Sequence, residues 1–439
     1  MAFIFVFISF ALMYIDYKET GALFTPFTVV AFPIVILSLY IEFIGSIRGY
    51  YNVTLDAYVF LLLNFIFIWL PGQLFFLATF GKLKFKNGFE QVKSFIQKNA
   101  IFLLFLLWVA IIAGLFDLFS FIHQYGITLI TSKIFKETYG RGILGHLVNL
   151  GYPSFLLLVS YIPARVNRKI VLGSIFLMAF VIFVSQTKYH LIIPLTTILI
   201  LKSFITKKKG IIYKNLVLGG VLISLIFFAT YFFGFAIAYG YDNALSSIVF
   251  IFSHFERYII GGPIALGKCL STYNQNFNIK YLFAVPVNIY HWINGSKEYI
   301  TSPGIDVLNI SWVPISETAT TNIYTMFGAV YLTLGYWGTL FFSLILGIIS
   351  YGIYYITMKT KKIGWIILNS WLLGTLTVSF FSYYFYLLLI WEVAFYSLVI
   401  PFLSSILNQI LSQNKKSIHE YNISLISKNH GQNRNVSKL

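Results

Sequence analysis

The 439-residue chain is 58% hydrophobic and 19% aromatic, with only 10% charged residues and a mean hydropathy of +0.81. This composition excludes a soluble globular protein, which would expose too much apolar surface, and it predicts an all-α polytopic membrane protein. The formal net charge of +17 does not indicate nucleic-acid binding, because the basic residues gather in short loops between apolar segments. The single cysteine, Cys269, has no partner for an internal disulfide.

Apolar runs predict the membrane spans. A transmembrane helix needs about 20 mostly apolar residues, and about 11 stretches of the chain, within a range of roughly 10 to 12, meet that need. We expect them to pack as a single domain over residues 1–411, because no internal repeat or second domain is visible. The predicted spans are 2–15, 26–46, 57–80, 100–122, 143–163, 170–186, 189–205, 213–238, 323–357, 363–380 and 385–411.

Basic loops predict the orientation. Lysines and arginines concentrate in alternate connections, which all fall on one side and mark that side as cytoplasmic. The basic tail, 412–439, falls on the same side, and we expect it to be disordered. The chain is thus expected to be a multi-pass plasma-membrane protein with a cytoplasmic C-terminus. The basic residues of these connections are Lys82, Lys84, Lys86, Lys93, Lys98, Arg165, Arg168, Lys169, Lys202, Lys207, Lys208, Lys209, Lys214, Lys359, Lys361 and Lys362.

The stretch 239–322 interrupts the apolar runs and is expected to form one large outer loop. Its first part, 244–260, predicts an interfacial or re-entrant helix that ends at Gly261, Gly262 and Pro263. The part from 271 to 321 is rich in Asn, Tyr, Ser and Pro, which favours an ordered loop with short helices. Glycines in the next span predict close packing or a bend there; they are Gly328, Gly335, Gly338 and Gly347.

Several outward-facing cations lie beside predicted membrane boundaries. A cation in that position can meet a lipid phosphate, and arginine offers a planar fork that binds phosphate oxygens in pairs. The structural alternative is that these side chains extend to the headgroups without a specific ligand. Arg257 stands out, because His254 and Glu256 flank it in an otherwise apolar stretch. The set comprises Arg141, Lys188, Arg257 and Lys268.

Acids and histidines of the outer loop are the candidates for a general base, because a base must reach a soluble hydroxyl. Carboxylates inside spans are costly unless paired, so those at Glu42, Asp117 and Glu392 are expected to pair with Arg141 or Lys188 or to line a cavity. The chain carries no P-loop, H-E-x-x-H, G-x-S-x-G or Asp-x-Asp motif, so we expect no metal or cofactor. The base candidates are Asp242, His254, Glu256 and Glu317.

The segment Thr321 to Gly328 reads Thr-Asn-Ile-Tyr-Thr-Met-Phe-Gly, and Tyr331 to Gly335 follows it. This pattern resembles the segment after the large periplasmic loop of bacterial O-antigen polymerases, the Wzy family, and the run Tyr258 to Gly262 is similar to that family as well. The resemblance implies a GT-C-like or O-antigen ligase-like bundle. It also implies a glycosyltransferase that polymerises undecaprenyl-diphosphate-linked oligosaccharide repeat units into O-antigen, capsule or related surface polysaccharide.

The resemblance further implies an active site on the periplasmic, outer face of the bacterial inner membrane. Arg257, with Arg141, Lys188 or Lys268, would bind the lipid diphosphate. His254, or else Glu256 or Glu317, would accept the proton, and Asn322 and Tyr324 would contact the substrate. The implied partners are the lipid-linked oligosaccharide, the bilayer and a chain-length regulator. The alternatives are an O-antigen ligase-like transferase and a lipid-linked oligosaccharide flippase or other transporter, although transporters usually show two related halves.

Overall fold

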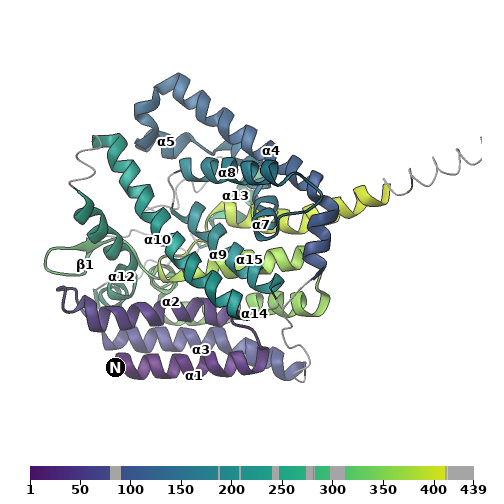
Figure 1. The fold of residues 1–439 in the computed structure, drawn as a ribbon. Helices are drawn as coiled ribbons and strands as arrows, with labels where there is room; N and C mark the ends of the chain where they lie inside the picture. Colours follow the sequence, from purple (N-terminus) through teal and green to yellow (C-terminus); the bar gives the residue numbers. More distant parts are fainter. Residues whose placement is uncertain are drawn as a thin grey trace, which may run out of the picture.

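A computed structural model describes residues 1–79, 90–185, 188–206, 209–239, 247–272, 282–296 and 312–410, together with residues 280 and 413. The described chain is predominantly helical (Figure 1), as the composition predicts. Asp242, much of the middle of the expected outer loop and nearly all of the tail 412–439 lie outside these residues.

Within the described residues, seven helical segments are long and apolar enough to cross a membrane. This agrees with a multi-pass helical membrane protein, whereas the full number of spans remains a prediction. The seven segments are α2 with the π-helical turn η1 (Pro26–Tyr40, Ile41–Gly45), α3 (Leu55–Ala78), α4 (Glu90–Tyr125), α6 with α7 (Gly142–Leu150, Tyr152–Ser160), α14 (Met326–Thr360), α15 with η4 (Ile363–Thr377, Val378–Phe380) and the helix Leu388–Ile410.

Four further described helices occupy the other predicted spans. They are α1 (Ala2–Thr20), α8 (Arg168–Val184), α9 (Lys188–Ile205) and α10 (Lys209–Tyr239). The connecting elements are η2 (Ile127–Thr131), α5 (Lys133–Thr138), α12 (Ile248–Thr272), α13 (Ala284–Ile293), β1 (Val313–Pro314) and β2 (Thr320–Thr321). The two short strands pair antiparallel, with Val313 opposite Thr321.

Threonine caps begin three of the long helices. The hydroxyl oxygens of Thr25, Thr54 and Thr325 accept the backbone N–H three residues on, which satisfies one of the free donors at each helix start. Pro26 also fits the first position of α2, where its missing N–H costs nothing. These starts lie close to the predicted ones, since both the cap and the apolar run are local features.

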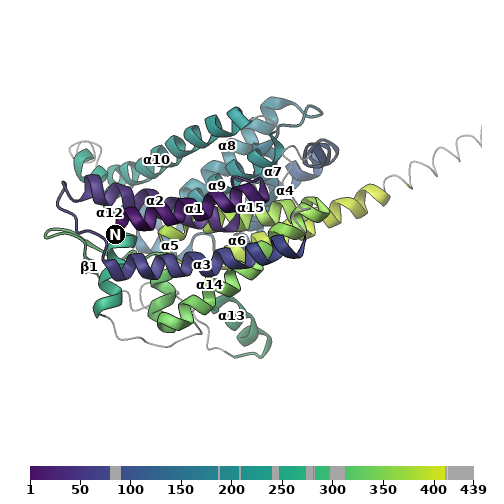
Figure 2. The ribbon, with the colours of Figure 1, turned by 90° about the horizontal axis from the view of Figure 1, so that it is seen from below.

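The helices α1, α2, α3 and α14 run side by side in one part of the bundle (Figures 1 and 2). Close approach of α14 to α3 requires a glycine, because a Cβ on Gly347 would lie 2.7 Å from the Ile68 carbonyl oxygen. A buried carboxylate, Asp16 on α1, accepts hydrogen bonds from the hydroxyls of Thr25 and Tyr351. These bonds tie three helix segments together.

Gly335 divides α14 into two parts. Its φ of +69° and ψ of −171° are readily adopted only by glycine, so the helix breaks between Leu334 and Tyr336. This confirms the bend that the glycines predicted. The predicted span 143–163 is also divided into two helices, because α6 ends at Leu150 and α7 starts at Tyr152.

The predicted end of the first outer helix is wrong. Gly261, Gly262 and Pro263 lie inside α12, which continues to Thr272. A Cβ on Gly261 would lie 2.7 Å from Thr321 Oγ1, and one on Gly262 would lie 2.5 Å from the Phe380 carbonyl oxygen. Tertiary packing that only glycine permits therefore keeps the helix intact, against the local tendency of Gly-Gly-Pro to end it.

The bundle has two distinct ends. The end that carries α12, β1 and the N-terminus lies at the left of Figure 2, and we call it the α12 end. At the far end of α14 is the turn that bears Lys359, Lys361 and Lys362, which we call the lysine-rich end. The candidate residues that fall on the described outer-loop segments lie at the α12 end.

Candidate functional site

Glu256 on α12 is a buried carboxylate that receives three contacts from the segment around the end of α2. The Tyr40 hydroxyl donates to its Oε1 at 2.6 Å, and the Tyr50 hydroxyl donates to its Oε2 at 3.2 Å. The Arg48 guanidinium lies 3.1 Å from Oε1. Because a buried carboxylate is costly without such partners, these contacts fix α12 to that segment. We call Tyr40, Arg48, Tyr50 and Glu256 the Glu256 cluster.

A tight turn after α2 brings Tyr50 to this cluster. The π-helical turn η1 ends at Gly45, and Gly49 adopts a left-handed φ of +82° that suits glycine. The Tyr50 N–H donates to the Gly45 carbonyl, and the Tyr51 N–H donates to the Ile315 carbonyl at 2.8 Å. The hairpin formed by β1 and β2 thus holds the turn from the other side.

Arg257 adjoins the cluster with an unused donor. Its Nε is buried and has no acceptor among the described residues, although buried N–H groups nearly always have one. Burial raises the pKa of the Tyr50 hydroxyl above its usual 10.0, the Glu256 carboxylate raises it further, and Arg257 lowers it. Arg257 is therefore close to Tyr50, and the hydrogen-bonding capacity of its Nε–H is left unused by the described residues.

A row of aromatic rings leads from α12 to α9. His254 packs edge-on against Tyr258, with ring centroids 4.7 Å apart, and Tyr258 stacks on Phe381 at 5.6 Å. Phe381 stacks on Tyr384, which lies 5.4 Å from Tyr189. All these separations fall in the range of favourable aromatic pairs. We call His254, Tyr258, Phe381, Tyr384 and Tyr189 the aromatic row.

Arg141 lies in a second place at the far end of this row. It precedes α6 and lines a hollow of about 210 Å³ with Tyr139, Asn149, Tyr189 and His190 among others. Its guanidinium is exposed and lies near enough to Tyr189 to interact with it electrostatically. The structure therefore does not join Arg141 directly to Arg257, but it connects them through the aromatic row.

The remaining predicted site residues are scattered around the Glu256 cluster. Lys268 is at the other end of α12, with its Nζ 5.3 Å from the centre of the Tyr51 ring. Glu317 is exposed on the turn between β1 and β2. Asn322 is half-buried and Tyr324 is only 2% exposed. Lys188 begins α9, and its side chain lies outside the described part of the structure.

Two acids inside predicted spans, Asp117 and Glu392, are hydrogen-bonded, but not to the expected Arg141 or Lys188. Asp117 on α4 accepts a hydrogen bond from the Gly140 N–H at 2.7 Å, next to Arg141. Glu392 accepts from the Asn149 side chain at 2.6 Å and pairs with His146. Both acids therefore support α6 and the loop before it, which carry the Arg141 hollow.

Sequence reasoning missed the tyrosines of this end. Tyr40, Tyr50, Tyr189 and Tyr384 belong to a set of 31 tyrosines, and nothing local separates them from the others. Arg48 lies outside the clusters of basic residues that mark the cytoplasmic side, and this position is a weak signal of a role at the outer end. Among the described residues, no three His, Cys, Asp or Glu side chains lie close enough together to hold a metal ion.

A comparison with family models gives one match. The model of a family of unknown function, DUF6337, matches residues 45–410. Neither the curated proteins nor the solved structures contain a match to the chain. The matched range begins within the turn after α2 and ends with the last described helix, so it includes the Arg141 hollow and all of the Glu256 cluster except Tyr40.

Proposed function

Starting from the fact that the chain belongs to the DUF6337 family, we propose that it is a glycosyltransferase that polymerises undecaprenyl-diphosphate-linked oligosaccharide repeat units. The reaction would take place at the α12 end, facing the outside of the bacterial inner membrane. The observation that carries this proposal is the buried Nε–H of Arg257, which has no acceptor among the described residues and is suited to a diphosphate oxygen.

In the proposed reaction, a hydroxyl of the acceptor sugar attacks the anomeric carbon of the donor glycan. The new carbon–oxygen bond forms as the bond to the lipid diphosphate breaks, and the diphosphate leaves with the electron pair. The hydroxyl proton passes to a base. Arg257 would stabilise the charge that develops on the diphosphate, an electrostatic role that a fixed cation fills where no metal ion does so.

The geometry distinguishes the roles of the neighbouring residues. Both carboxylate oxygens of Glu256 already accept hydrogen bonds, so Glu256 is better suited to positioning α12 than to taking up a proton. His254 lies one turn before Arg257 and Tyr258 and is half-buried, so it is the preferred base. Glu317 is the exposed alternative on the hairpin.

The aromatic row would hold the glycan. Aromatic rings offer flat apolar faces, against which the C–H faces of sugar rings can stack, and the row extends from His254 toward Arg141. A donor diphosphate at Arg257 and a second lipid-linked chain near Arg141 would then lie at the two ends of the row, in which Tyr384 is buried and the other rings are half-buried. Two cationic sites joined by such a row suit an enzyme with two diphosphate-linked substrates.

The test is to substitute Arg257 and examine surface polysaccharide by gel. We expect Arg257→Ala to reduce polymer at least about 100-fold at an unchanged protein level, because removing one donor to a developing charge commonly has an effect of that size. Arg257→Lys keeps the charge but loses the fork, and we expect partial activity. Arg165→Ala, an exposed change between α7 and α8, is the control. Wild-type chain lengths from Arg257→Ala would refute the assignment.

Deleting the gene separates polymerase from ligase. Without a polymerase, single repeat units still reach the final acceptor, whereas without a ligase no repeat unit does. The two enzymes would share the donor diphosphate and hence the role of Arg257. We expect single repeats.

A further inference from the structure

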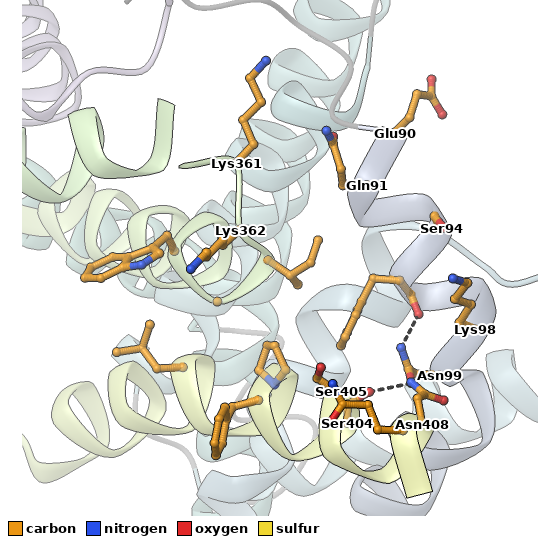
Figure 3. A pocket seen from close by; sticks show the side chains of 18 residues that line it. Glu90, Gln91, Ser94, Lys98, Asn99, Lys361, Lys362, Ser404, Ser405 and Asn408 are labelled. Atoms are coloured by element: carbon orange, nitrogen blue, oxygen red, sulfur yellow. Dashed lines mark hydrogen bonds between the residues drawn. The ribbon is translucent and has the colours of Figure 1, made fainter. Parts of the chain in front are cut away.

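A large hollow opens at the lysine-rich end, far from the Glu256 cluster. It has a volume of about 1060 Å³ and lies between the start of α4, the turn that joins α14 to α15, and the helix Leu388–Ile410. Figure 3 shows Lys98 on α4 across the hollow from Lys361 and Lys362. Nothing in the proposed transfer reaction uses this space.

The charge around the hollow is positive. Lys98, Lys361 and Lys362 all line it and are exposed. The one acid of the lining, Glu90, is paired with Lys93 at 3.3 Å. Three ammonium groups therefore surround a space in which the single carboxylate already has a partner, and such a space attracts an anion.

Lys361 occupies a position that usually belongs to glycine. It ends α14 with a left-handed φ of +52°, and its N–H donates to the Thr357 carbonyl. Among the described residues it is the only non-glycine residue with positive φ. A side chain is disfavoured in this conformation, so the presence of lysine here is consistent with a use for its charge.

The walls of the hollow are largely apolar, and hydrogen bonds join α4 to the last helix at its base. Phe95, Trp365, Leu398 and Phe402 line it, and Phe402 is 64% exposed. At the base, α4 is kinked at the buried Asn99, whose side chain donates to the Phe95 carbonyl and accepts from Ser404 and Asn408 (Figure 3). The bonds from Ser404 and Asn408 hold the last helix to α4 below the hollow.

We propose that this hollow binds a phospholipid with an anionic headgroup. The phosphate would lie between Lys98 and Lys362, and an acyl chain would lie along Leu398 and Phe402. A cationic rim next to an exposed apolar wall matches a ligand with both an anionic and an apolar part. A free phosphate would leave the apolar wall unused, which is why a lipid is the favoured source of the phosphate group.

The test measures lipid binding to the purified full chain in detergent. The probes are dioctanoyl phosphatidylglycerol, dioctanoyl phosphatidylcholine and inorganic phosphate, and thermal unfolding reports binding, because a ligand of the folded state raises the unfolding temperature. We expect saturable binding of the anionic lipid. The triple variant Lys98→Gln, Lys361→Gln and Lys362→Gln should weaken it by at least about tenfold, since each cation contributes to the attraction.

A charge-matched variant controls for the loss of net charge. Lys169→Gln, Lys202→Gln and Lys359→Gln removes three lysines that do not line the hollow, and we expect it to bind like the wild type. Equal affinity in the wild type and the first triple variant would overturn the proposal. So would equal weakening by the control, equal binding of the zwitterionic lipid, or inorganic phosphate that protects as well as the lipid does. All these comparisons are independent of transferase activity.

Discussion

The Glu256 cluster and the Arg141 hollow lie at the two ends of one aromatic row, yet they use their polar groups differently. In the cluster, both carboxylate oxygens of Glu256 are bound by side chains of the protein itself. In the hollow, Arg141 is exposed beside an open space of about 210 Å³. A charged residue can therefore hold the bundle together at one place and remain available to a ligand at the other.

This difference shows how stability and binding are divided at the α12 end. Glu256 and its tyrosines contribute chiefly to holding α12 in place, which in turn sets the position of Arg257. Arg141 contributes little to holding any element, because its loop is supported by Asp117 through the Gly140 N–H. Substitutions should thus affect stability strongly in the cluster and weakly in the hollow.

The largest effect on stability is expected from Glu256→Ala. The change removes the acceptor of two tyrosine hydroxyls and the partner of Arg48. We therefore expect the free energy of unfolding to fall by about 3 kcal/mol. This value is in the lower part of the range for breaking a buried charged pair, because Arg48 is half exposed. Chemical unfolding in detergent measures it. Glu317→Ala, an exposed acid on the nearby hairpin, is the matched control. Similar losses in the two variants would show that the cluster does not hold α12.

A smaller effect is expected from Tyr50→Phe, and it depends on pH. At pH 7 the variant should lose about 1 kcal/mol, the usual contribution of one hydrogen bond. Since burial and then Glu256 raise the pKa of the Tyr50 hydroxyl, its stabilising contribution is complete below pH 10 and is lost as the pH rises toward the raised pKa. Unfolding measured from pH 7 to 11 should therefore show the difference between wild type and variant shrinking above pH 10. A constant difference would contradict the inferred shift.

The smallest effect on stability is expected from Arg141→Ala. The side chain is exposed, so the free energy of unfolding should change by less than about 0.5 kcal/mol. If the proposed function is correct, polymer should nevertheless be lost. Measuring both in the same strain tests the division described above, because a large loss of stability would make Arg141 another structural residue.

The sequence predicted the approximate positions of most described helices, since these depend on run length, hydropathy and local caps such as Thr25 and Thr325. It could not predict the partners of Glu256, because Tyr40 lies 216 residues away in the chain. It was wrong about the end of α12, where contacts of Gly261 and Gly262 with distant segments outweigh the local signal. His254 and Glu256 were both candidates for the general base, and their contacts separate them, because both carboxylate oxygens of Glu256 are bound by the protein.

The π-helical turn η1 also sets the direction in which the chain leaves α2. Tyr40 precedes this turn, whereas Arg48 and Tyr50 follow it, and all three meet the same carboxylate. A π-turn contains one residue more than an α-turn, so if Ile41–Gly45 wound as an α-helix instead, everything after it would be rotated by about 100°. Arg48 and Tyr50 would then point away from Glu256. The contacts with Glu256 therefore depend on how η1 is wound as well as on which amino acids follow it.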